Sequence, residues 1–283
     1  MSVLERIFAI AKKKRPRVVM PEMYDERIIG AAHQLEQAEM ACIVSLSETK
    51  DVMLDFLVSS RGVKPTVARR MLAKPLIRAA AMVSIGDADV VVAGANSPTK
   101  RVLEAARLAI GLKDNVLVPS SFFLMLFPDG REIIFADCAV NVAPDAAGLA
   151  AIAKASEISA NALFGQSEVV LLSFSTGMSG KGESVLLVRE AAQISGFLGP
   201  IQADAALNPR IAIKKGLGDG KANVLIFPNL DAGNIAYKLA QELAGAQAVG
   251  PILQGFRRPI CDLSRGATVG DIVAATAVTI ALG

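Results

Sequence analysis

The sequence has no tryptophan, a single histidine and only three cysteines among its 283 residues. Aromatic residues make up 5% of the chain, although 52% of it is apolar. A core with so few rings must be built from alanine, valine, isoleucine and leucine, which is typical of parallel sheets covered by helices on both faces. The one histidine, His33, lies in a helical pattern and is interpreted as a helix-surface residue, so a histidine-dependent triad is disfavoured.

The cysteines Cys42, Cys138 and Cys261 lie far apart and form no C-x-x-C pair, so neither a disulfide framework nor a zinc site is predicted. No apolar run reaches the ~18 residues of a bilayer-spanning helix, and the start of the chain lacks a secretion signal. The formal net charge of +3 is too small to favour nucleic acid as a partner. We therefore expect a soluble, cytoplasmic protein without a membrane segment, a metal site or a nucleic-acid partner.

Short apolar runs alternate with helix-length segments over the first part of the chain. The runs RVVMPE, ACIVSLS and ADVVVAGAN predict strands, and helices are expected after the first strand, over 66–83 and over about 99–111. This alternation predicts an α/β fold with a mostly parallel sheet. A chain of this length also predicts two domains.

The second half begins with a different pattern. Two β-rich runs between Asn115 and Asn141 are joined by FPDGR, which predicts an antiparallel hairpin and a domain change near residue 112. Helices over 144–163, 183–196, 202–215 and 231–245 then alternate with the strands VVLLSFS, NVLIFPN and AVGPIL.

Four polar segments follow strands: GANSPTK, SFSTGMSGKGES, FPNLDAGN and LSRGATVGD. In open α/β sheets, ligands bind where strands end and helices begin. The second segment matches neither the Walker A spacing nor the dinucleotide fingerprint, because Gly177, Gly180 and Lys181 give G-x-x-G-K-G. Its N–H groups and hydroxyls suit an anion, and a plain turn is an equal alternative.

The last polar segment has two interpretations. Thr268 and Asp271 form T-x-x-D, which resembles a capping box at the start of a helix, and Ser264 and Gly266 suit an ordinary turn. Capping does not explain Arg265. A guanidinium close to a helix N-terminus can form a binding site for an oxyanion or a phosphate.

Taken together, FADCAVN, SFSTGMSGKGES, GKANVLIFPNLDAGNIAYKLAQ, GPILQG and DLSRGATVGDIV resemble the phosphate acetyltransferase (phosphotransacetylase) family, within the phosphate acetyl/butyryltransferases. The likeness is densest from residue 116 onward, and the chain is shorter than the family between about 46 and 61. The resemblance implies reversible transfer of an acetyl or other short acyl group between coenzyme A and inorganic phosphate, by direct attack in a ternary complex. Coenzyme A, acyl phosphate and inorganic phosphate are then substrates, with no further cofactor and no metal.

The resemblance also implies roles for individual residues. The family's catalytic residues fall on Ser264, Arg265 and Asp271: Asp271 would be the general base for the thiol, Ser264 would stabilise the oxyanion, and Arg265 would bind the phosphoryl group. A substrate-binding arginine best matches Arg61. Further candidates for substrate binding are Ser175, Thr176, Gly177 and Asn234.

One family arginine is replaced. The position on the helix after GAN is Glu104, and Arg101 and Arg107 flank it at a spacing of three residues, on one face of the helix. We predict that Arg101 supplies the missing positive charge and that Glu104 orients it. The alternative is a solvated helix face.

The implied fold is isocitrate/isopropylmalate dehydrogenase-like, with residues 1–112 and 259–283 in the first α/β domain and residues 113–258 inserted as the second. The resemblance also implies a homodimer formed through the inserted domain. Two alternatives remain: a phosphate propionyl- or butyryltransferase with the same mechanism, and a non-catalytic acyl-CoA-binding module. An oxidoreductase is disfavoured, because the sequence shows no metal-binding aspartate cluster.

Overall fold

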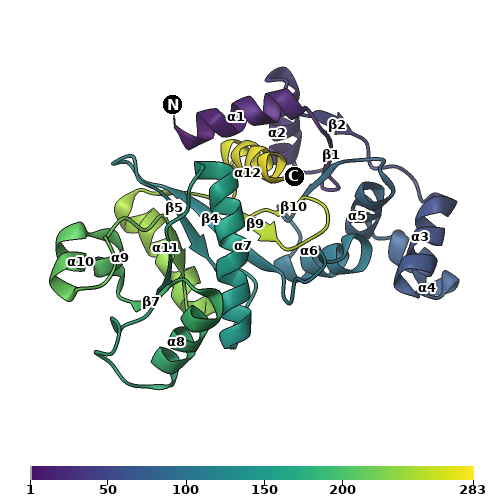
Figure 1. Ribbon diagram of the computed structural model, residues 1–283. Coiled ribbons are helices and arrows are strands. Elements are labelled where there is room, and N and C mark those ends of the chain that lie inside the picture. Colours follow the sequence, from purple (N-terminus) through teal and green to yellow (C-terminus); the bar gives the residue numbers. More distant parts are fainter. Residues whose placement is uncertain (1) are drawn as a thin grey trace. The chain divides into compact units, whose positions relative to one another are not determined.

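A computed structural model describes residues 2–283 (Figure 1). The chain forms two compact units, the first made of residues up to Asp114 together with Gly250–Gly283, and the second of Asn115–Val249. The sequence led us to expect changes near residues 112 and 259. The return falls at Gly250, within a single strand, β9 (Gln247–Gln254), that carries the chain from the second unit into the first. The protein is mixed α/β, and most of its strands are parallel.

The sheet of the first unit has four parallel strands in the order β2-β1-β3-β10: β1 (Arg17–Val19), β2 (Cys42–Val44), β3 (Val90–Ala93) and β10 (Ile260–Asp262). Strand β10 also pairs antiparallel with β9, where Cys261 lies opposite Ile252. Because β1, β3 and β10 run in one direction, their C-terminal ends meet at one side of the sheet. We call this side the carboxyl edge.

Two groups of helices accompany this sheet: α1, α2 and α12 pack together, and α3, α4 and α6 gather around α5 (Figure 1). Every residue of α12 from Ile272 to Ile280 is buried, which explains why this helix is apolar on all sides. The helices are α1 (Val3–Lys14), α2 (Glu26–Gln37), α3 (Asp51–Arg61), α4 (Pro65–Leu72), α5 (Pro75–Ile85), α6 (Thr99–Ala105), its π-helical continuation η1 (Ala106–Ile110), and α12 (Val269–Leu282).

The predicted helix over 66–83 is in fact two helices, α4 and α5. Pro75 disfavours helical geometry at Lys74, the residue before it, so one helix ends there and the next begins at the proline. The prediction of one continuous helix was therefore wrong.

The second unit contains the predicted hairpin, which the structure confirms. Its strands β4 (Ser120–Leu126) and β5 (Glu132–Ala136) are antiparallel, and Phe123 lies opposite Phe135. The sheet continues from β5 through parallel strands in the order β8 (Val224–Ile226), β6 (Val169–Leu172) and β7 (Leu198–Ile201). Strand β7, which is only four residues long, had not been predicted.

Five helices cover this second sheet: α7 (Ala146–Phe164), α8 (Glu183–Ser195), α9 (Ala203–Leu207), α10 (Pro209–Lys215) and α11 (Leu230–Ala244). The predicted helix over 202–215 is divided at Asn208, again because a proline follows. The few aromatic residues gather in this core, where the rings of Phe123 and Tyr237 stack with centroids 4.2 Å apart. Within residues 2–283, no helix combines the length and apolarity that crossing a membrane requires.

Candidate active site

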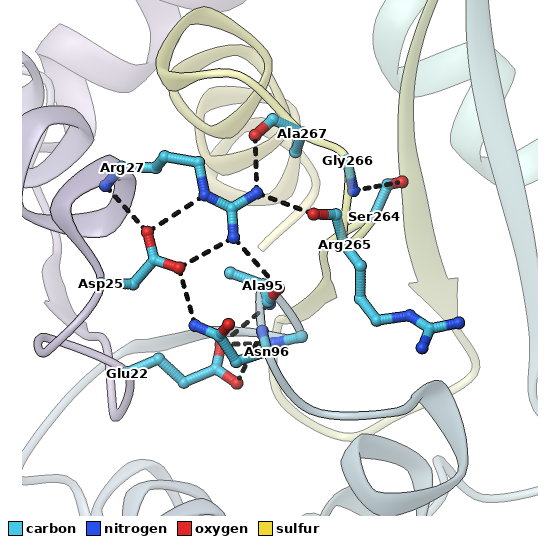
Figure 2. A network of polar contacts seen from close by, with 10 residues as sticks. Glu22, Asp25, Arg27, Ala95, Asn96, Ser264, Arg265, Gly266 and Ala267 are labelled. Carbon is cyan, nitrogen blue, oxygen red and sulfur yellow. Dashed lines mark hydrogen bonds and ion pairs between the residues drawn. The ribbon is translucent and has the colours of Figure 1, made fainter.

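Three loops of the first unit meet at its carboxyl edge (Figure 2). They follow β1 (residues 20–25), β3 (residues 94–98) and β10 (residues 263–268). Each loop directly follows a buried part of its strand, and each carries polar side chains. This is the place where open α/β sheets bind ligands.

One side chain, Arg27, joins all three loops. Its Nη1 donates hydrogen bonds to the carbonyl oxygens of Arg265 (2.7 Å) and Ala267 (3.1 Å). Its Nη2 donates to the carbonyl oxygen of Ala95 (3.2 Å) and to Asp25 Oδ2 (2.8 Å), while Nε donates to Asp25 Oδ1 (3.1 Å). The planar guanidinium suits this task, because its donors point in several fixed directions.

Asp25 holds this guanidinium in place. It is the N-cap of α2, where it accepts a hydrogen bond from the Arg27 backbone N–H (2.8 Å), and it also accepts one from Asn96 Nδ2 (2.7 Å). The hydrogen bonds from Arg27 and Asn96 hold the pKa of the Asp25 carboxyl well below its usual range. The pair therefore stays ionised across neutral pH.

The loop after β3 is built around a second carboxylate, Glu22, which is only 3% exposed. Glu22 accepts hydrogen bonds from the backbone N–H groups of Gly94 (2.8 Å), Ala95 (2.9 Å) and Asn96 (3.2 Å). Gly94 has a φ of +108°, and a Cβ atom there would lie 2.6 Å from the backbone nitrogen of Leu263. Only glycine allows the ends of β3 and β10 to approach this closely.

Ser264 and Arg265 have fixed backbones and exposed side chains. The Ser264 hydroxyl accepts a hydrogen bond from the Gly266 N–H (3.3 Å), which leaves its own hydrogen available to donate. The Arg265 guanidinium makes no hydrogen bond or ion pair with residues 2–283, and it points away from the Arg27 network (Figure 2). An oriented hydroxyl beside an unpaired guanidinium can bind an anion.

Asp271, the third residue of α12, completes a capping box with Thr268. Its Oδ2 accepts hydrogen bonds from the backbone N–H (3.0 Å) and the hydroxyl (2.8 Å) of Thr268, and its own N–H donates to that hydroxyl (3.2 Å). The capping interpretation of Asp271 is therefore confirmed. The capping box fixes the position of this carboxylate at the helix start, seven residues beyond Ser264.

Arg101 and Glu104 form the ion pair that the helical spacing predicted, with Nη1 and Oε2 2.9 Å apart. Both line a cavity of about 210 Å³ in the first unit, which also receives Lys74 from the start of α5 and Glu22 from the loop after β1. The rest of the lining is mostly apolar: Pro21, Tyr24, Pro75, Leu76, Ile77, Ser97 and Ala105. Two cations thus border a small apolar cavity next to the carboxyl edge.

Arg61 lies elsewhere. Its Nε donates to the carbonyl oxygen of Leu108 (2.9 Å) and its Nη2 to that of Ile110 (2.8 Å), so it caps the C-terminal end of η1. The guanidinium therefore has a structural role at the end of η1, and contact of Arg61 with substrate stays a prediction.

Ser175, Thr176, Gly177 and Asn234 belong to the second unit. The Ser175 hydroxyl accepts from the Gly180 N–H (2.7 Å), the Thr176 hydroxyl donates to Gln202 Oε1 (3.2 Å), and the Gly177 N–H donates to the Pro200 carbonyl (2.9 Å). Asn234, on α11, donates from Nδ2 to the Cys138 carbonyl oxygen (3.1 Å). Each of these groups thus has a hydrogen-bond partner within the second unit.

Sequence reasoning missed Glu22, Asp25 and Arg27. The available signal was three charged residues directly after the first predicted strand, at the end where ligands bind. Over the described part of the chain, no group of three or more His, Cys, Asp or Glu side chains is arranged to hold a metal ion.

Comparisons with known proteins show the family of this chain. The family model described as phosphate acetyl/butaryl transferase matches residues 45–280. The phosphate acetyltransferase of Nitratidesulfovibrio vulgaris is 38% identical over 309 residues, covering 95% of this chain but only 44% of that protein. The phosphate acetyltransferase of Acetivibrio thermocellus is 36% identical over 323 residues, covering 99% of this chain and 97% of that protein.

A solved structure gives the same result. A phosphotransacetylase from Streptococcus pyogenes matches with a TM-score of 0.90 and 31% identity, over 99% of this chain and 98% of that one. The family match covers well over half of the sequence, and the loop with Ser264, Arg265 and Asp271 lies inside it. The chain therefore belongs to the phosphate acetyl/butaryl transferase family.

Proposed function

We propose that this chain is an acyltransferase that moves an acetyl or other short acyl group reversibly between coenzyme A and inorganic phosphate. The observation that carries the proposal is the loop of residues 263–268. Its backbone is held by Arg27, whereas the side chains of Ser264 and Arg265 stay exposed and without an acidic partner. Relatives named phosphate acetyltransferase support the same activity.

The proposed reaction is a direct transfer. Asp271 takes the proton of the coenzyme A thiol, because a thiol with a pKa near 8.5 is mostly protonated at neutral pH. The thiolate attacks the acyl carbonyl, a C–S bond forms, and the C–O bond to phosphate breaks. The phosphate leaves with the bonding electron pair, and the proton returns to phosphate or solvent.

Ser264 and Arg265 stabilise the charge that develops in this step. The free hydroxyl hydrogen of Ser264 donates to the carbonyl oxygen as it becomes an oxyanion. The guanidinium of Arg265 binds two phosphate oxygens and disperses the charge of the leaving group. The N-terminus of α12 adds a favourable dipole for anions.

The substrate anion meets further positive charge in the first unit. Lys74 and Arg101 border the cavity beside the carboxyl edge, and Glu104 holds the Arg101 guanidinium at 2.9 Å. We assign Arg101 the role of the family arginine that Glu104 replaces. Ser175, Thr176, Gly177 and Asn234 remain candidates for contacts with coenzyme A from the second unit.

The proposal includes an isocitrate/isopropylmalate dehydrogenase-like arrangement with the second unit inserted in the first, a cytoplasmic location, and a homodimer. Support for a dimer comes from α11. Its residues Ile235, Leu239 and Leu243 recur every four positions on one helical face and are 56%, 52% and 81% exposed. A row of exposed large apolar side chains marks an association surface.

The activity itself is tested with coenzyme A and acetyl, propionyl or butyryl phosphate. We expect thioester formation with at least one of them, measured by its absorbance. We also expect the reverse reaction, in which inorganic phosphate and the acyl-CoA thioester give acyl phosphate and coenzyme A. Comparing the three rates decides between acetyl transfer and the longer-chain alternative. Binding of coenzyme A without turnover of any acyl phosphate would instead identify a non-catalytic acyl-CoA-binding module.

Asp271→Asn separates the two roles of that residue. An asparagine oxygen still accepts the hydrogen bonds of Thr268, so the helix start survives, but the base is lost. We expect kcat to fall by roughly two to four orders of magnitude with little change in thermal stability. Asp145→Asn, the same change at the N-cap of α7, is the matched control and should leave kcat unchanged. Near wild-type turnover of Asp271→Asn would reduce Asp271 to a cap.

Arg101→Ala tests whether Arg101, which lines the cavity, binds the substrate anion. If Arg101 binds the substrate anion, KM for acyl phosphate or coenzyme A rises at least roughly tenfold, about 1.4 kcal/mol. Arg107→Ala is the control, because Arg107 lies on the same helix and outside the lining of the cavity. Equal KM values in the two variants would assign Arg101 to the solvated face.

The dimer is tested by Leu239→Asp combined with Leu243→Asp. We expect a wild-type dimer in sedimentation equilibrium and a dissociation constant raised on the order of 100-fold or more in the variant, because two apolar anchors are lost. Ile213→Asp, at an isolated exposed isoleucine of α10, is the control. A monomeric wild type, or an unchanged dimer in the double variant, contradicts the proposed interface.

A further inference from the structure

Asp262, the last residue of β10, is a buried carboxyl group that the proposed mechanism does not use. It is 0% exposed, and neither of its side-chain oxygens has a hydrogen-bond partner among the described residues. Buried polar groups are nearly always hydrogen-bonded, and an ionised carboxylate without a partner is the most costly exception. Burial of this kind favours the protonated, neutral form.

The carboxyl group is packed against backbone. A Cβ atom added at Gly94 would lie 2.4 Å from Asp262 Oδ1, so the absence of a side chain at Gly94 is what makes room for the acid. The next residue, Leu263, donates its N–H to the Ala93 carbonyl oxygen at 2.7 Å. Asp262 is therefore closed to water in this arrangement, and separation of the ends of β3 and β10 would open it.

The groups that act on Asp262 are all neutral or negative. Burial, together with the Glu22 carboxylate from the loop after β1, raises its pKa from 3.8 to about 7. The Thr99 hydroxyl at the start of α6 lowers it in part, although its approach falls outside hydrogen-bond geometry. The adjacent Cys261 thiol is itself buried, which raises its pKa to about 12 and keeps it neutral. Asp25, by contrast, has a guanidinium beside it.

Asp262 stands directly before the loop that carries the proposed catalytic residues. Ser264 follows two positions later, and Arg27 holds this loop only through the carbonyl oxygens of Arg265 and Ala267. A negative charge on Asp262 would face Glu22 without a cation. Separation of Leu263 from Ala93 would admit water to this charge, and it would also move Ser264 and Arg265.

We propose that Asp262 is a positioning residue that must be protonated for the loop of residues 263–268 to keep its geometry. Its ionisation then sets an alkaline limit to the site. The expected effect of this ionisation on activity rests on the proposed acyl transfer. The expected effects on thermal stability and on hydrogen exchange of the loop do not.

The first test is thermal stability against pH. Asp262 binds its proton more tightly in the folded chain than in the unfolded one, so its contribution to stability is full below about pH 4 and is lost as the pH rises to about 7. Asp262→Asn resembles the neutral acid and cannot ionise. The quantity compared is the melting temperature of Asp262→Asn minus that of wild type. We expect this difference to be larger at about pH 8 than at about pH 4.5, by at least ~3 °C. A constant difference would show that Asp262 does not titrate in this range.

A matched control is Asp25→Asn. Asp25 titrates below this pH range in the folded and the unfolded chain, so its melting difference from wild type should stay constant. A pH-dependent difference in this control would mean that other groups cause the effect. If Asp262→Asn does not fold, Asp262→Ala serves in the same comparison, because it also lacks the titrating group.

The second test measures the loop directly by hydrogen exchange of the peptide containing residues 263–268. Relative to Asp262→Asn, wild type should lose protection roughly threefold or more between about pH 6 and about pH 8, as the open population grows. A pH-independent ratio would overturn the positioning role even if Asp262 titrates.

The third test is activity. The kcat of Asp262→Asn relative to wild type should rise roughly tenfold between about pH 6.5 and about pH 8.5, because only wild type loses the protonated form. An unchanged ratio in active enzymes contradicts the alkaline limit. Absence of thioester formation in both proteins at every pH would instead overturn the proposed function, and the melting and exchange measurements would still decide whether Asp262 is protonated and holds the loop.

Discussion

The geometry of the carboxyl edge depends on the guanidinium of Arg27. It reaches Ala95 and Arg265, which lie 68 and 238 positions further along the chain, and it contacts both of these loops through backbone carbonyls rather than through their side chains. Ser264 and Arg265 are thereby left free for a ligand while their main chain is fixed. Such preorganisation matters for transfer reactions, because groups held at the right place lose little entropy when the substrate arrives. A lysine has the charge of Arg27 but not its fork of donors.

Four carboxyl groups at or near this edge have four different environments. Asp25 faces a guanidinium, Glu22 is surrounded by backbone N–H groups, Asp271 caps a helix, and Asp262 has no hydrogen-bond partner among the described residues. Two of them consequently differ in proton affinity: hydrogen bonds lower the pKa of Asp25, whereas burial raises that of Asp262 to about 7. Division of labour among acids in one site follows from such differences in environment.

Much of the fold could be predicted from the sequence, because alternating strands and helices and the FPDGR hairpin turn are local patterns. The divided helices followed from Pro75 and Pro209, which are also local but were given too little weight. Ser264, Arg265 and Asp271 could be put forward as candidates because they lie within one short motif. Arg27 could not, since its partners lie in distant loops. The contacts of Arg61 with the carbonyl oxygens of η1 could not be predicted either, because the sequence does not show which groups an arginine reaches.

The discontinuous first unit has a consequence for synthesis on the ribosome. Strands β1, β2 and β3 emerge early, but their neighbour β10 and the buried helix α12 follow only after the whole second unit, residues 115–249. At 5–20 residues per second, the edge of β3 waits on the order of ten seconds for its partner. The second unit is continuous in the chain and can fold during that interval. Until then Val91, Val92 and Ala93 form an unpaired, apolar strand edge, which is open to association with other chains.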